Sequence, residues 1–220
     1  MATAPNPEFA NNPDPRCACV LLLDTSGSMS GAPINALNQG LKAFQQDLQE
    51  DGLARRRVEI AIVTFGNGGV QTIQDFVTAG EFAAPNLSEG GNTPMGAAIQ
   101  LGLDLVRDRK ATYKQNGIVH YRPWVFMITD GGPTDGDAWR SAAQRVKTEV
   151  AAKGLEFFAV GVAGADMQVL SEITPRALVL DGLKFRELFV WLSQSQRRVS
   201  GSKVGEQVPM PKVSFGSPIA

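Results

Sequence analysis

The stretch Cys19-Val20-Leu21-Leu22-Leu23-Asp24-Thr25-Ser26-Gly27-Ser28 decides how this chain folds. Its first half is a short apolar run of the kind that forms a buried β-strand. A carboxylate at Asp24 and hydroxyls at Ser26 and Ser28 then follow at alternating positions. Hard cations such as Mg²⁺ prefer carboxylate, hydroxyl, carbonyl and water oxygens as ligands. The end of this strand is therefore a candidate cation site, which either performs chemistry or holds a partner.

The composition is that of an ordinary globular protein. The chain has 220 residues, 43% hydrophobic and 20% charged, which is enough for one large α/β domain. A formal net charge of −1 gives no general attraction to nucleic acid or anionic lipid. The longest apolar runs fall far short of the roughly 20 residues that span a bilayer. Residues 1–15 lack the basic start and apolar core of a secretory signal, so we expect a cytoplasmic protein with no membrane span.

Helical and strand patterns alternate along the chain, which predicts a mostly parallel sheet covered by helices on both faces. The short turn at residues 66–69 cannot make a parallel crossover, so the strand after it is predicted to be antiparallel at one edge. The expected strands span 19–24, 58–65, 70–77, 124–129, 155–162 and 177–180, and the expected helices cover 34–48, 97–106, 138–153, 168–173 and 185–192.

The two ends of the chain differ from its middle in composition. We expect a flexible N-terminal segment over residues 1–15, one domain over residues 16–198 and an extended tail over residues 199–220. The tail is rich in Gly, Ser and Pro, and its Pro-containing stretch cannot be helical. Its apolar side chains are expected either to dock a partner or to pack on their own domain, and they are Val208, Met210, Val213 and Phe215.

Several other polar and sulfur-containing residues have ordinary structural explanations. Cys17 and Cys19 lie two apart on a predicted strand and so share one face, where buried free thiols are common. Asp135 and Asp137 precede the helix expected from residue 138, and we predict that they cap it.

Separate segments bring oxygen ligands to one edge of the predicted sheet. In open parallel sheets, ligands bind beyond the carboxyl ends of the strands, where the strand order reverses. Thr93 lies in a glycine-rich loop before a helix, and Asp130 directly follows the strand at 124–129. Each residue alone has the composition of a turn or helix cap. Their convergence with the first strand predicts a metal site formed by Asp24, Ser26, Ser28, Thr93 and Asp130.

These segments resemble a known site. Asp24-Thr25-Ser26-Gly27-Ser28-Met29, Gly91-Asn92-Thr93-Pro94-Met95 and Ile128-Thr129-Asp130-Gly131-Gly132-Pro133 are similar to the metal-ion-dependent adhesion site (MIDAS) of von Willebrand factor A (VWA) domains. The similarity in element order runs from about residue 17 to residue 198. Within that family the chain resembles compact bacterial proteins of the tellurium-resistance TerY type. The resemblance implies a three-layer α-β-α, Rossmann-like fold with one antiparallel edge strand.

The resemblance also implies how the site works. Ser26, Ser28 and Thr93 would bind Mg²⁺ directly, with Mn²⁺ or Ca²⁺ as alternatives, and Asp24 and Asp130 would act through bound waters. Having few direct carboxylate ligands, the ion would keep residual positive charge and attract an Asp or Glu carboxylate of a protein partner. The family implies an adaptor in a bacterial stress-response or phosphorylation-signalling assembly, with a kinase and a phosphatase of the same system as partners.

A magnesium-dependent phosphotransferase or phosphatase is the main enzymatic alternative, with Asp24 as the phosphoryl-accepting nucleophile, as in haloacid-dehalogenase-like enzymes. Those enzymes place a second Asp two residues later as acid and base. This chain has Ser26 there, and an unactivated hydroxyl cannot do that work near neutral pH. We therefore expect a binding protein and not an enzyme.

Two further enzyme classes fit less well. A serine hydrolase would need Ser at the centre of Gly27-Ser28-Met29-Ser30-Gly31, where the chain has Met29. The only histidine, His120, precedes the strand at 124–129 and is expected at the opposite end of the sheet from the serines. The sequence also lacks the glycine-rich motifs that bind nucleotide phosphates.

Overall fold

The computed structural model describes residue 9 and residues 11–218. The strands are β1 (Cys17–Thr25), β2 (Val58–Gly66), β3 (Gly69–Thr78), β4 (Trp124–Thr129), β5 (Glu156–Gly161), β6 (Ala177–Leu180) and β7 (Gly216–Pro218). The helices are the 3-10 helix η1 (Gly27–Met29) and the α-helices α2 (Ala32–Glu50), α3 (Ala54–Arg57), α4 (Met95–Gln115), α5 (Ala138–Ala151), α6 (Met167–Ile173) and α7 (Phe185–Gly201).

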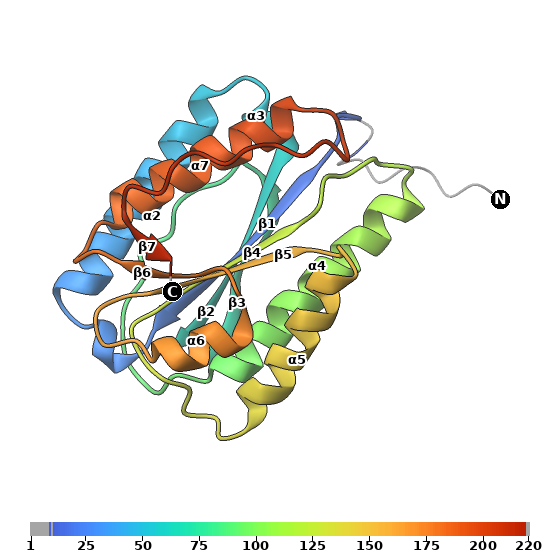
Figure 1. Cartoon of the computed structure of the whole chain (residues 1–220). Helices are drawn as coiled ribbons and strands as arrows, with labels where there is room; N and C mark the ends of the chain where they lie inside the picture. Colours follow the sequence, from blue (N-terminus) through green and yellow to red (C-terminus); the bar gives the residue numbers. More distant parts are fainter. Residues whose placement is uncertain (1–8, 10, 219–220) are drawn as a thin grey trace.

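The strands form one sheet between two layers of helices, as Figure 1 shows. The strand order is β3-β2-β1-β4-β5-β6-β7, and β2, β1, β4, β5 and β6 run parallel to their neighbours in that series. Helices α2 and α7 cover one face, and α4, α5 and α6 cover the other. The expected three-layer α/β fold is confirmed.

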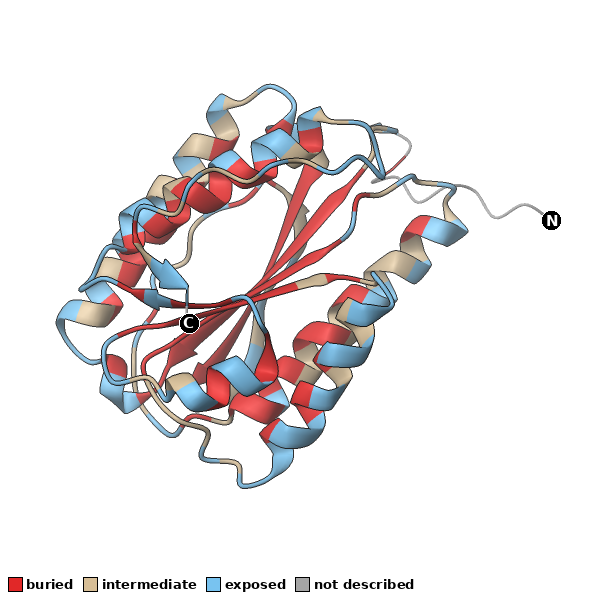
Figure 2. Ribbon diagram, in the orientation of Figure 1, coloured by how far each residue is buried: buried red, intermediate tan, exposed pale blue. Residues whose placement is uncertain are grey.

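Strand β1 lies in the middle of the sheet and is buried along its whole length (Figure 2). Because successive side chains of a strand point to opposite faces, Leu21 and Leu23 pack in the core beneath α2 and α7, whereas Val20 and Leu22 pack beneath α4 and α5. A strand covered on both faces must be apolar throughout, which explains the unbroken run of Val and Leu. No helix in the described ranges is long and apolar enough to cross a membrane.

Both edge strands are antiparallel, one more than the sequence predicts. Strand β3 pairs antiparallel with β2, as expected, and β7 pairs antiparallel with β6. Strand β7 is held in place by the residue before it, because Phe215 is fully buried and its ring packs edge-on against Trp191 of α7. The sequence does not reveal β7, because a stretch of Gly, Ser and Pro has low strand propensity and forms a strand only through this packing.

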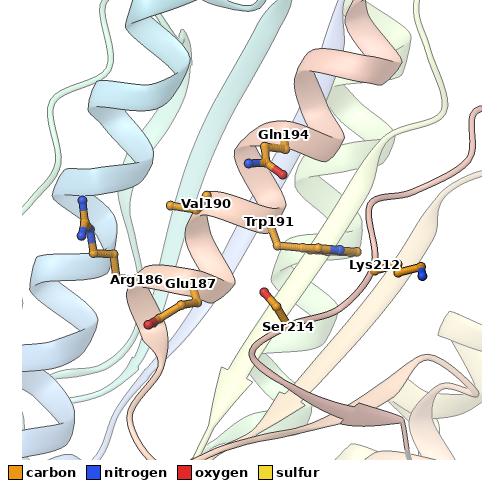
Figure 3. A pocket seen from close by; sticks show the side chains of 7 residues that line it. All are labelled: Arg186, Glu187, Val190, Trp191, Gln194, Lys212 and Ser214. Carbon is orange, nitrogen blue, oxygen red and sulfur yellow. The ribbon is translucent and has the colours of Figure 1, made fainter.

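The segment that leads to β7 runs back along α7 (Figure 1). Trp191 Nε1 donates a hydrogen bond of 2.9 Å to the carbonyl of Pro211, and Arg198 Nη1 donates one of 3.0 Å to that of Pro209. A cavity of about 190 Å³ remains between α7 and this segment, with Trp191 reaching toward it from the helix (Figure 3). Of the two alternatives for the tail, packing on its own domain is the one observed.

The N-terminal segment expected to be flexible lies largely outside the described residues. Within it, Phe9 is buried and packs edge-on against Tyr113 of α4, with the ring centroids 6.1 Å apart. Asn12 donates a hydrogen bond of 2.8 Å to the carbonyl of Arg56. This part of the segment is therefore attached to the amino-terminal end of the sheet.

A buried ionic cluster lies beneath Phe9. The Glu59 carboxylate of β2 pairs with Arg16 Nε and with Arg109 Nε, both at 2.8 Å, and it accepts a hydrogen bond from the Tyr113 hydroxyl. The side chains of Arg16 and Glu59 are fully buried. The guanidinium groups of Arg16 and Arg109 also lie over the ring of Phe9. Glu59 is thus the anion that balances two buried cations.

We predict that Glu59→Ala lowers the free energy of unfolding by about 3–5 kcal/mol, because the change leaves buried arginine charge without its counter-ion. Urea denaturation followed by circular dichroism measures the change. Glu172→Ala on the exposed side of α6 is the matched control and should leave the midpoint where it is. Equal midpoints for the two variants would contradict the structural role of Glu59.

The two cysteines are free and buried, as predicted. Burial raises the pKa of the Cys19 thiol to about 12, and it raises the pKa of the Cys17 thiol further. A thiol that is both buried and protonated is unreactive.

We therefore predict that Ellman's reagent at pH 8 labels neither cysteine in the native protein and both in guanidinium chloride. Rapid labelling of the native protein would show that this face of β1 is open.

Candidate metal site

The pairing of β1 with β4 creates the site at the carboxyl ends of these strands. Residue Leu23 lies opposite Ile128 in the parallel register, so Asp24 and Thr129 come next on adjacent strands. Thr129 Oγ1 donates a hydrogen bond of 2.5 Å to Asp24 Oδ2. The chain moves from β1 to β2 on one side and reaches β4 on the other, so strand order reverses here. Ligand sites of open α/β sheets lie at such points.

A continuous line of polar atoms joins the first segment to the third. The backbone N–H of Ser26 donates to Asp24 Oδ1 at 2.8 Å. The hydroxyls of Ser26 and Ser28 are 3.0 Å apart, and Ser28 Oγ donates to Asp130 Oδ1 at 2.7 Å. The structure therefore brings these four residues together as the sequence predicts.

Thr93 joins this group from the loop before α4. Thr93 and Thr134 bind each other twice, because the Thr93 N–H donates to Thr134 Oγ1 and the Thr134 N–H donates to the Thr93 carbonyl, both at 2.9 Å. A Cβ atom placed on Gly131 would lie 3.7 Å from Thr93 Oγ1 and 3.9 Å from Ser28 Oγ. The space in front of Gly131 is therefore lined by hydroxyls from two of the predicted segments.

Close backbone contacts fix the loops around these oxygens. The N–H of Gly27 donates to the carbonyl of Gly91 at 3.1 Å, which ties the first loop to the second. Gly66, at the end of β2, has φ +148°, and a Cβ there would lie 2.2 Å from the backbone carbon of Thr25. Only glycine fits between these loops.

The site runs from buried carboxylate to exposed hydroxyl. Asp24 is fully buried, Ser26 and Thr93 are nearly so, and Ser28 is exposed. Burial raises the pKa of Asp24 above its ordinary value, and the Asp130 charge adds to this, while hydrogen bonds from Ser26 and Thr129 oppose it. A cation placed beside these carboxylates would offset the cost of burying the Asp24 charge.

The structure adds residues that sequence reasoning did not single out, and it corrects one prediction. Thr129 hydrogen-bonds Asp24, and Thr134 hydrogen-bonds Thr93. In the sequence, the only sign of these supporting roles is that both threonines lie close to a predicted site residue. Asp137 is at the N-cap of α5, but its side chain makes no capping bond. Asp135 instead accepts a hydrogen bond of 3.0 Å from the N–H of Ala97, near the start of α4. The predicted cap is therefore wrong for Asp135, which reaches across to another helix, whereas Asp137 occupies the predicted cap position without a side-chain bond.

The donor set fits a hard divalent cation. Within residues 9 and 11–218, no group of three or more His, Cys, Asp or Glu side chains could hold a metal. A cation here would therefore depend on the hydroxyls of Ser26, Ser28 and Thr93 as well as on Asp24 and Asp130. All of these donors are oxygens, which suits Mg²⁺, Mn²⁺ or Ca²⁺.

The fold and site together define a three-layer α/β domain with an oxygen-lined cation site at its strand switch point. The chain belongs to the von Willebrand factor type A domain family, whose family model matches residues 19–182. A search of curated proteins found no match to the chain.

Solved structures share this fold at low sequence identity. The pilus adhesin SpaC from Lactobacillus rhamnosus GG, in an open conformation, aligns with a TM-score of 0.68 and 16% identity over 84% of this chain and 30% of the adhesin. The mussel byssus protein PTMP1 with a zinc-occupied MIDAS motif aligns with a TM-score of 0.53 and 17% identity, over 82% and 48% of the two chains. Our chain thus spans less than half the length of either protein.

A third structure resembles the chain over more of its own length. The manganese-loaded TRAP protein of Plasmodium vivax aligns with a TM-score of 0.54 and 17% identity, over 81% of this chain and 73% of that one. Relatives of the same fold have therefore been observed with zinc or manganese.

We predict that Thr129→Val destabilises the protein by about 1–3 kcal/mol, because it leaves Asp24 Oδ2 buried without its hydroxyl donor. Thr129→Ser keeps the hydroxyl and is the matched control. Chemical denaturation in EDTA measures both variants. Equal stability of the Thr129→Val and Thr129→Ser variants would show that this hydrogen bond does not hold Asp24 in place.

Proposed function

We propose that this chain is a protein-binding domain whose partner completes the shell of a divalent cation. Asp24, Ser26, Ser28, Thr93 and Asp130 would hold the cation, and Mg²⁺ is the ion that the oxygen donors fit best. The observation that carries the proposal is the convergence of three hydroxyls on a site with only two carboxylates. With Asp24 and Asp130 acting through bound waters, the direct protein ligands would be neutral hydroxyls, so the ion would keep positive charge on its open side and attract an outside anion.

The surroundings of the site make this attraction depend on the cation. Ser30 Oγ donates to the Glu89 carboxylate at 3.1 Å on the exposed rim. A Cβ on Gly132 would lie 3.6 Å from Cβ of Asp166, so another carboxylate lies close to the loop after β4. With Asp24 and Asp130 inside, this rim repels an incoming carboxylate. A bound cation would place positive charge directly at the open coordination position, so an Asp or Glu of a partner would bind only when the ion is present.

A binding role accounts for the site better than phosphoryl transfer from Asp24. A nucleophile must reach its substrate, whereas Asp24 is fully buried and both of its oxygens already accept hydrogen bonds. The Ser26 hydroxyl, two residues later, lies 3.0 Å from the Ser28 hydroxyl and supplies no second carboxylate to act as acid and base. These contacts suit a residue that supports cation ligands, and we propose that the chain is not an enzyme.

The cellular setting is proposed on the resemblance of the motifs alone. The likeness to TerY-type proteins supports a cytoplasmic adaptor in tellurite or chemical stress defence, with a kinase and a phosphatase of the same system as partners. Capture of binding partners on the immobilised protein would identify the protein that presents the carboxylate.

We predict that divalent ions raise the melting temperature of the wild-type protein, because a ligand that binds only the folded state stabilises it by about 2.7 kcal/mol at 100 times its Kd. Thermal unfolding with Mg²⁺, Mn²⁺, Ca²⁺ and Zn²⁺ after EDTA treatment measures the effect. Thr93→Ala should abolish most of the shift, and Thr148→Ala on the exposed side of α5 should not. An identical shift in the Thr93 variant would place the ion elsewhere.

The space in front of Gly131 offers a second test. Gly131→Val would fill the space beside Thr93 Oγ1 and Ser28 Oγ and should abolish ion-dependent stabilisation, because no cation ligand is itself changed yet access is lost. Gly52→Val is the control, since a Cβ there meets nothing within 4 Å. Full ion binding by the Gly131 variant would contradict the placement of the site.

Capture of partner proteins then distinguishes a protein-binding adaptor from an enzyme. Partners retained with Mg²⁺ and released by EDTA, and not retained by Asp24→Ala or Thr93→Ala, would support a cation-bridged interface. Partner binding that is unchanged by EDTA and by both substitutions would overturn the proposal of a cation-bridged interface. Magnesium-dependent hydrolysis of phosphoesters that Asp24→Ala abolishes would favour the phosphatase alternative instead.

A further inference from the structure

A large open cavity lies at the end of the sheet opposite the cation site. Its volume is about 800 Å³, and it is lined by Trp124 and Glu156, which begin β4 and β5, and by Arg176, which directly precedes β6. Parallel strands that start here end at the cation site. A ligand in this cavity would therefore not touch the cation, and the two sites can be tested separately.

The cavity carries more positive charge than negative. Its lining includes Lys110, Arg122, Lys153 and Arg176 but only two acids, Glu156 and Glu206. Both arginines pair with Glu156, and the Glu206 carboxylate accepts a hydrogen bond of 2.9 Å from the N–H of Lys203. The acids are thus already engaged, and the two lysines remain.

Neither lysine has a carboxylate partner among the described residues. Lys110 Nζ donates to the carbonyl of Gly154 at 3.2 Å, and Glu149 also approaches Gly154 without forming an ion pair with this lysine. Lys153 has φ +55° at the end of α5, where glycine is the usual residue, so a cationic side chain stands at a position that disfavours it. Two ammonium groups are therefore available on one side of the cavity.

The charge of Lys110 also affects the neighbouring His120. Burial lowers the pKa of His120, and the Lys110 charge lowers it further. His120 lines the same cavity, and its ring lies against that of Tyr113 with the centroids 5.2 Å apart and the planes tilted by 32°. The local potential thus resists a further cation and favours an anion.

The remaining wall is partly apolar, with Glu206 and Gln207 also among its lining residues. It is formed by the end of α7 and the segment after it, and Val204 is 41% exposed. The apolar lining residues are Val199, Val204, Val208 and Met210. An inorganic ion would leave this wall in water, whereas an organic anion would cover it.

We propose that this cavity binds a small organic phosphate monoester, with the phosphate between Lys110 and Lys153 and its apolar body against Val204 and Met210. A phosphate monoester carries about two negative charges at neutral pH, which matches two ammonium groups without an ion-pair partner among the described residues. Its size suits a cavity of about 800 Å³. The site lies outside the cation-binding loops and does not depend on the proposed function.

The test is calorimetric titration of the full chain in EDTA, with phenyl phosphate, benzoate and inorganic phosphate as probes. Phenyl phosphate should bind at one site per chain and more tightly than benzoate, which has one charge, or inorganic phosphate, which has no apolar body. Lys153→Met should weaken binding about tenfold, as expected for loss of a charged hydrogen bond. Because Lys153 is exposed, this effect would not reflect lost packing.

Controls separate this site from its surroundings. Lys110→Met should weaken binding to a similar extent, whereas Lys42→Met on the exposed side of α2 should leave it unchanged. Absence of saturable phenyl phosphate binding would overturn the proposal. So would equal affinity in wild type and Lys153→Met, or binding of phenyl phosphate no tighter than that of inorganic phosphate.

Discussion

The parallel pairing of β1 with β4 is the constraint on which the site depends. Register places Leu23 beside Ile128, and everything that follows on the two strands is thereby aligned. A shift of one residue would turn every side chain to the opposite face and separate Asp24 from Thr129. The apolar run that buries β1 on both faces prevents that shift. Core packing and site geometry are thus consequences of the same few residues.

The two ends of the sheet have opposite electrical character. At the carboxyl ends, Asp24 and Asp130 lie beneath a rim that includes Glu89 and Asp166. At the amino ends, buried and exposed cations outnumber acids, and even the buried Glu59 is shared by two arginines. A nearly neutral chain therefore presents one pole suited to cations and another suited to anions. The net charge of the chain does not reveal that acidic and basic groups lie at opposite ends of the sheet.

The sequence predicts the fold and the convergence of the proposed cation-site residues because both follow from local patterns. Asp24, Thr93 and Asp130 stand at strand ends or helix starts, where topology forces loops together. Thr129 and Thr134 are not predictable in this way, since their partners are set by register and by contact between distant loops. Strand β7 escapes prediction for a similar reason: its place depends on Phe215 meeting Trp191, not on its own composition.

The position of β7 has a consequence for how the chain folds during synthesis. Strand β6 is complete once residue 180 has emerged, but its outer edge is covered only by residues 216–218. Until then the nascent sheet exposes unpaired backbone donors and acceptors, a template to which other chains can add. The β6 edge is thus protected from aggregation only after residues 216–218 have been synthesised, well after β6 itself.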